Sequence, residues 1–95
     1  MNLCVAIADR HIISFVYDCH DRVVIPAAHG IDKTTGNAVL RGYQVRGTSS
    51  TRAVPLWDLF LADKMQNVHV LDETFADDPP QYRRGDKHIN ICCEL

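Results

Sequence analysis

The feature that most constrains the fold is an alternation of apolar and polar side chains that returns along the chain in short segments. In residues 12–19, IISFVYDC, the odd-numbered positions are apolar or aromatic, whereas Ser14 and Asp18 occupy the other side. A period of two residues is typical of a β-strand with one buried face. Further strands are predicted at 23–25, 38–47, 56–61 and 67–71. Short strands joined by short turns favour a small β-barrel or sandwich.

The segments that flank these strands carry helix and turn signals. The spacing of apolar residues in 2–9 predicts a short helix, for which Asn2 is a possible cap. The sequence HDR at 20–22 is expected to form a tight turn, and Pro26 is expected to end the regular pairing of the second strand. The sequence DKTTGN at 32–37 is rich in residues that accept left-handed backbone angles, so it predicts another turn.

Length and composition indicate one domain in a reducing compartment. A chain of 95 residues has room for a single core. The N-terminus has no basic leader and no apolar run is long enough to cross a membrane, so we expect a cytoplasmic protein. In that compartment the four cysteines are expected to be free, buried thiols. Cys92 and Cys93 are adjacent and should point to opposite faces of a strand.

The last part of the chain has the composition of a tail. Residues 77–88, DDPPQYRRGDKH, are polar and contain two prolines, so we expect them to lie extended on the surface of the barrel. The apolar residues of 89–95 alternate and could dock as an extra strand. We therefore divide the chain into a barrel domain with its helix, residues 1–76, and a C-terminal tail, residues 77–95.

Five motifs occur in an order that is similar to a known family. They are AI..R.IISFVY at 6–17, RVVIP at 22–26, G.AVLRGYQV at 36–45, WDLFLADKM at 57–65 and VHVLDETF at 68–75. Together they resemble the WYL domain of bacterial transcription regulators. The family's naming triplet is replaced here by Ala38-Val39-Leu40, and Asp58 stands where the family often has an arginine.

The resemblance implies both a fold and a function. The implied fold is mainly β with a short N-terminal helix (α+β), built as a five-stranded SH3/Sm-like β-barrel with an extended C-terminal tail. The implied function is anion sensing, with nucleotides or single-stranded nucleic acid as ligands that basic side chains bind.

The strand LRGYQVRG at 40–47 holds the first candidate site. If Leu40 and Gly42 point inward, Arg41 and Tyr43 lie together on the outer face. A guanidinium beside a phenol suits a phosphate or a base, through bidentate hydrogen bonds and stacking. On a solvent-facing surface, Arg41→Ala would change stability by no more than about 0.5 kcal/mol. The other candidate ligand-binding residues are Arg22, Arg46, Arg52 and Lys64.

Two functions are compatible with these residues. The first is a non-enzymatic sensor that binds an anionic ligand, needs no cofactor and modulates a partner. The second is a protein-interaction or homodimerisation module without a small ligand. Its candidate interface residues are Trp57, Leu59, Ile89 and Ile91. The formal net charge of −2 excludes a strongly basic protein that coats nucleic acid but allows a local basic patch. The scattered histidines and cysteines have no metal-ligand spacing, and no nucleophile pairs with a base, so neither a metal nor a catalytic site is predicted.

Overall fold

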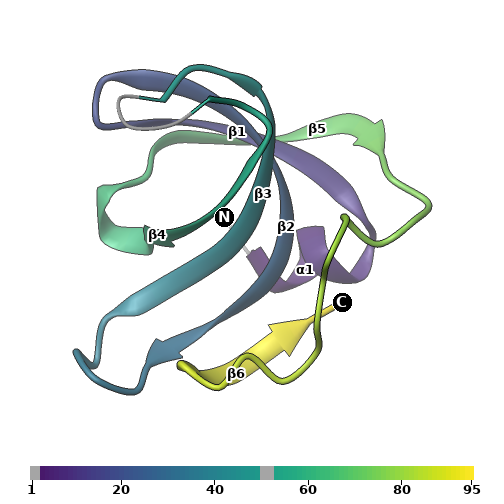
Figure 1. Ribbon diagram of the computed structural model, residues 1–95. Coiled ribbons are helices and arrows are strands. Elements are labelled where there is room, and N and C mark those ends of the chain that lie inside the picture. Colours follow the sequence, from purple (N-terminus) through teal and green to yellow (C-terminus); the bar gives the residue numbers. More distant parts are fainter. Residues whose placement is uncertain (1–2, 50–52) are drawn as a thin grey trace.

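The computed structural model of this chain describes residues 3–49 and 53–95, and it is mainly β, as the sequence predicts (Figure 1). The elements are α1 (Leu3–Ala8), β1 (His11–Tyr17), β2 (His20–Asp32), β3 (Ala38–Gly47), β4 (Leu56–Leu61), the 3-10 helix η1 (Ala62–Lys64), β5 (Gln66–Thr74) and β6 (Ile89–Glu94). The bounds predicted for β3 and β4 are confirmed, whereas β2 and β5 are longer than their apolar patterns. Within the described ranges, no helix is long and apolar enough to cross a bilayer.

The described strands form one six-stranded antiparallel sheet in the order β4-β3-β2-β1-β5, with β6 paired to β2 off this path. The sequence predicted five strands, and the sixth comes from the tail. The register of the β2–β3 ladder shifts between Pro26 and Ala28, because proline has no N–H for the ladder. The second strand therefore does not end at Pro26 but continues through the irregularity to Asp32, and this added length is what β6 pairs with.

The turn between β1 and β2 lies two residues earlier than predicted. Asp18 and Cys19 form the turn with φ angles of 50° and 63°, and Tyr17 pairs directly with His20. Two consecutive positive φ angles are typical of the two-residue hairpin turn whose twist matches that of its strands. The prediction of a turn at 20–22 is thus wrong, and those residues already belong to β2.

The core lies inside the curl of the sheet (Figure 1). Phe15, Tyr17 and Phe60 meet edge to face, with ring centroids 5.0 to 6.3 Å apart. The hydroxyl of Tyr17 accepts a hydrogen bond of 3.1 Å from the backbone N–H of Leu61. These contacts join β1 to β4, which are not neighbours in the strand order, so the sheet must curl strongly upon itself.

The tail docks as the sequence indicated, but its cysteines behave differently from the prediction. Residues 89–94 form β6, which pairs with the second half of β2. Cys93 forms a disulfide with Cys4 of α1, whereas Cys19 and Cys92 are free and exposed. The prediction of four free, buried thiols is therefore wrong. Strand alternation explains why Cys93 and not Cys92 pairs with Cys4, because it directs Cys93 toward the side that faces α1 and Cys92 away from it.

Candidate functional site

The outer face of β3 carries the first part of the candidate site. Leu40, Gly42 and Gln44 are buried, whereas Arg41 and Tyr43 are half-buried on the opposite face. A Cβ at position 42 would collide with the side chain of Val24, so this glycine serves the packing of the core. Arg41 and Tyr43 thus lie together outside the core. The sequence predicted this arrangement for the case that Leu40 and Gly42 point inward.

A segment of the tail lies across this outer face and, together with it, lines an open cavity of about 510 Å³. We call residues 81–88 the strap and this cavity the strap pocket. Its lining consists of the strap residues together with Ala28 of β2, Arg41 of β3 and Trp57 of β4. Cavities of this size accommodate small-molecule ligands.

Four basic side chains line the strap pocket: Arg41, Arg83, Arg84 and Lys87. Asp86 contributes a carboxylate. Arg84 forms an ion pair of 3.2 Å with Glu94 of β6. Arg83 and Lys87 are exposed and form no ion pair with any residue in the described part of the chain. The pocket is therefore positively charged in a protein whose formal net charge is −2.

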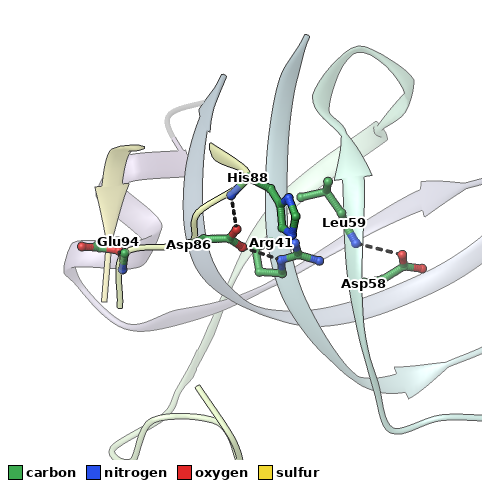
Figure 2. Close-up of polar contacts among 7 residues, drawn as sticks. Arg41, Asp58, Leu59, Asp86, His88 and Glu94 are labelled. Atoms are coloured by element: carbon green, nitrogen blue, oxygen red, sulfur yellow. Dashed lines mark hydrogen bonds and ion pairs between the residues drawn. The ribbon is translucent and has the colours of Figure 1, made fainter. Parts of the chain in front are cut away.

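Asp86 orients Arg41 toward this cavity. Nε of Arg41 donates to Oδ2 of Asp86 at 2.8 Å, and the backbone N–H of His88 donates to Oδ1 at 2.9 Å (Figure 2). Burial raises the pKa of Asp86, but these two hydrogen bonds and the nearby positive charge outweigh it, and the pKa lies below its usual value. Only Nε of Arg41 is engaged by the described residues, so its two Nη atoms keep the planar fork that binds phosphate or carboxylate.

Two aromatic rings, those of Trp57 and Tyr82, also line the strap pocket, whereas Tyr43 lies beside Trp57 outside the lining. The Trp57 ring lies 6.3 Å from the Tyr82 ring at an interplanar angle of 23°, and 5.3 Å from the Tyr43 ring at 58°. Nε1 of Trp57 donates to the carbonyl oxygen of Pro80 at 2.8 Å, which fixes the indole against the start of the strap. Such rings offer stacking surfaces to a planar ligand.

Three of the other predicted ligand residues, Arg22, Arg46 and Lys64, do not line this pocket. Arg22 is only 3% exposed and lies inside the core. Arg46 is exposed and pairs with Glu73 at 2.6 Å, an interaction that holds the pKa of Glu73 below its usual value. Lys64 is exposed on η1. Arg52 lies outside the described residues.

The predicted interface residues are largely covered by the chain itself. Ile89 is 2% exposed and belongs to the core, so it is not available for a partner in this fold. Leu59 and Ile91 are half-buried in their strands, and Trp57 is half-buried against the strap.

The sequence interpretation missed Tyr82, Arg83, Arg84 and Lys87, because the tail was treated as a polar surface segment. A signal was nevertheless present, since YRRGDKH at 82–88 combines an aromatic ring with closely spaced cations. The sequence alone, however, does not show that this segment lies over Arg41 and Trp57 in the folded protein. In the described ranges, no group of three or more histidine, cysteine or acidic residues could hold a metal ion.

Comparisons with protein-family models, with characterised proteins and with solved structures found no match to this chain. The strap pocket is therefore interpreted from its own chemistry.

Proposed function

We propose that this domain is a non-enzymatic sensor that binds an anionic, base-containing ligand, a nucleotide or single-stranded nucleic acid, in the strap pocket and modulates a partner protein. One observation carries the proposal: four cations and two aromatic rings converge on a single cavity of about 510 Å³. The Nη fork of Arg41 would bind a phosphate, Arg83 and Lys87 would add electrostatic attraction, and Trp57 would stack on a base.

The proposed architecture is the WYL-like SH3/Sm barrel that the sequence motifs resemble. The strong curl of the sheet supports it, because Tyr17 and Phe60 bring β1 and β4 into contact across the core. In this interpretation the tail completes the ligand site of the barrel by supplying one wall of the pocket.

The alternative function, a protein-interaction or homodimerisation module, has weaker support. Its candidate residues Trp57 and Ile89 are occupied by contacts within the chain. Among the described residues, the large apolar side chains that remain exposed are Val5, Ile31 and Val70, and they belong to three different elements. Light scattering of the protein alone would detect a homodimer directly.

A fluorescence titration tests the sensor function. Trp57 is the only tryptophan and lines the pocket, so its emission should respond to a ligand that stacks there. The probes are adenosine monophosphate and a short oligothymidylate, each at two salt concentrations, about 50 and 200 mM. Binding that depends on phosphate contacts must weaken as the salt concentration rises, because salt screens the charges and the release of counterions into a more concentrated solution gains less entropy. Binding that ignores salt contradicts the electrostatic mechanism.

A matched pair of double variants identifies the site. Arg83→Ala/Lys87→Ala removes two cations from the pocket, and Arg46→Ala/Lys64→Ala removes the same charges from exposed positions outside its lining. We expect the first variant to weaken binding about tenfold or more and to reduce the salt dependence, and the second to bind nearly as the parent does. Equal effects of both variants would mean that overall charge, and not the strap pocket, attracts the ligand.

A further inference from the structure

The strap is tied to the end of β6 by three polar contacts. Arg84 pairs with Oε1 of Glu94 at 3.2 Å, and the backbone N–H of Gly85 donates to Oε2 of the same carboxylate at 2.9 Å. The hydroxyl of Tyr82 donates to the carbonyl oxygen of Leu95 at 3.0 Å. The first half of the strap carries one aromatic ring and two cations of the pocket. Glu94 and Leu95 thus hold it on one side, and the stacking of Tyr82 on Trp57 holds it on the other.

The end of β6 is in turn held by a covalent bond to the other end of the chain. Cys93, the residue before Glu94, forms a disulfide with Cys4 of α1, across a sequence separation of 89 residues. The noncovalent anchors at this end include the pairing of Ala28 with Glu94 and a hydrogen bond of 2.9 Å from the N–H of Leu95 to the carbonyl oxygen of Ala27. These contacts lie at the end of a strand, where pairing frays most easily.

We propose that the Cys4–Cys93 disulfide is a redox latch for the strap pocket, an inference that rests on the proposed function for its ligand. In the oxidised protein the latch keeps Glu94 and Leu95 under the strap, and the pocket is formed. In the reduced protein the end of β6 is released, the strap loses these partners, and the affinity for the anionic ligand falls. In a reducing compartment, disulfides are usually transient and often sense redox state, which is the behaviour required here.

The reducing agent of this switch is a dithiol, either a small molecule or a redox protein. One of its thiolates attacks a sulfur of the Cys4–Cys93 bond, forms a mixed disulfide and expels the other cysteine as a thiolate. The second thiolate of the dithiol then attacks the mixed disulfide and expels the remaining cysteine. Two electrons and the two thiol protons pass from the dithiol to the protein, which leaves two cysteine thiols and an oxidised dithiol.

The second half of the strap has anchors that do not depend on β6's last residues. Asp86 is bound to Arg41, and the carbonyl oxygen of His88 accepts a hydrogen bond of 2.9 Å from the N–H of Lys33. Reduction should therefore release residues 82–85 and the end of β6 while residues 86–88 stay in place. This selectivity distinguishes a latch from a disulfide that merely stabilises the whole fold.

Amide hydrogen exchange tests the latch without any ligand. The protein carries Cys19→Ser and Cys92→Ser so that the free thiols cannot exchange with the disulfide, and it is compared before and after treatment with dithiothreitol. We expect exchange at Gly85 and Leu95 to accelerate about tenfold or more on reduction, whereas the β1–β2 hairpin exchanges as before. Unchanged exchange at Gly85, or equal acceleration in all strands, overturns the proposal.

Two further measurements separate this inference from the proposed function. Adenosine monophosphate, titrated against both redox forms, should bind at least about fivefold more weakly to the reduced form. If it binds neither form, the sensor function fails, while the exchange data still decide whether the disulfide controls the strap. Glu94→Ala in the oxidised protein removes two of the three ties and should accelerate exchange at Gly85 with the disulfide intact. Slow exchange at Gly85 in that variant overturns the latch even if the reduced protein unfolds.

Discussion

Nε of Arg41 lies 2.8 Å from Oδ2 of Asp86, and this ion pair joins the outer face of β3 to the strap. The side chains retain only 27% and 14% of their exposure, so neither group is fully solvated. The sequence placed Arg41 on a solvent-facing functional surface, where its removal would cost almost nothing in stability. In the structure the side chain is instead half-buried and paired with Asp86, so we expect its removal to cost stability as well as binding.

Arg41→Ala should therefore lower the free energy of unfolding by about 1–2 kcal/mol, since it leaves a poorly solvated carboxylate without its charged partner. Arg46→Ala is the matched control, because it breaks an ion pair with Glu73 whose side chains are 53% and 47% exposed. Exposed ion pairs contribute at most about 1 kcal/mol to the free energy of unfolding, and often less. Urea unfolding of both variants measures the difference. An Arg41→Ala protein as stable as the parent would show that the pair does not hold the strap.

Acid should weaken the same contact. The pKa of Asp86 is depressed in the folded protein, so the folded state favours the ionised carboxylate. The resulting stabilisation is complete above the unfolded value of about 3.9 and is lost as the pH falls through the lower folded value. Unfolding free energies measured from pH 6 down to pH 2 should therefore decline below about pH 4. The Asp86→Asn protein should be less stable than the parent at pH 6, and its free energy of unfolding should fall less steeply as the pH is lowered. If the unfolding free energies of the two proteins fell in parallel with pH, the acid sensitivity could not be assigned to Asp86.

The strands of the sheet could be predicted because their signal is local. Period-two alternation identified β1, and strand-like apolar segments bounded by turns placed β3 and β4 to the residue. The hairpin turn was misplaced because Asp18 and Cys19 continue the alternation of β1 although both have positive φ angles. Pro26 was taken as the end of a strand because a proline interrupts a ladder, but here the ladder shifts its register and continues.

The candidate site could be predicted only in part, because it depends on contacts between distant segments. Arg41 and Trp57 were identified from the strands that carry them. The strap was not, because residues 81–88 have no regular structure and take their position from partners elsewhere in the chain, including Arg41 and Glu94. The disulfide was missed for the same reason, since its cysteines are 89 residues apart in sequence.

The cysteine arrangement predicts a simple labelling pattern. Treatment of the native protein with iodoacetamide, without a reducing agent, should modify Cys19 and Cys92, because both are free and exposed. Cys4 and Cys93 should stay unmodified because a disulfide has no thiolate to react. After reduction and unfolding, all four residues should react. Peptide mass spectrometry locates the adducts, and labelling of Cys4 in the native, unreduced protein would refute the pairing.

Arg22, which the sequence placed among the ligand-binding residues, is buried inside the core. Its Nε and Nη2 donate to the carbonyl oxygen of Tyr17 at 3.2 and 3.1 Å, and its Nη1 donates to Oε1 of Gln44 at 3.3 Å. The guanidinium also lies 5.4 and 5.7 Å from the ring centroids of Tyr17 and Phe60. The cation is thus held by carbonyl oxygens and aromatic faces inside the core, where it cannot reach the strap pocket.

Arg22→Ala should consequently lower the free energy of unfolding by about 2–4 kcal/mol, because it leaves a cavity and removes a donor from the buried Gln44 amide oxygen and from the partly buried Tyr17 carbonyl oxygen. Arg22→Met should lower the free energy of unfolding by less, since the methionine side chain can still fill the space beside the rings of Tyr17 and Phe60. Urea unfolding measures both losses. Titration of the folded Arg22→Met protein with adenosine monophosphate should give the affinity of the parent, because position 22 does not line the pocket. A variant that unfolds normally but binds more weakly would instead place Arg22 in the ligand site.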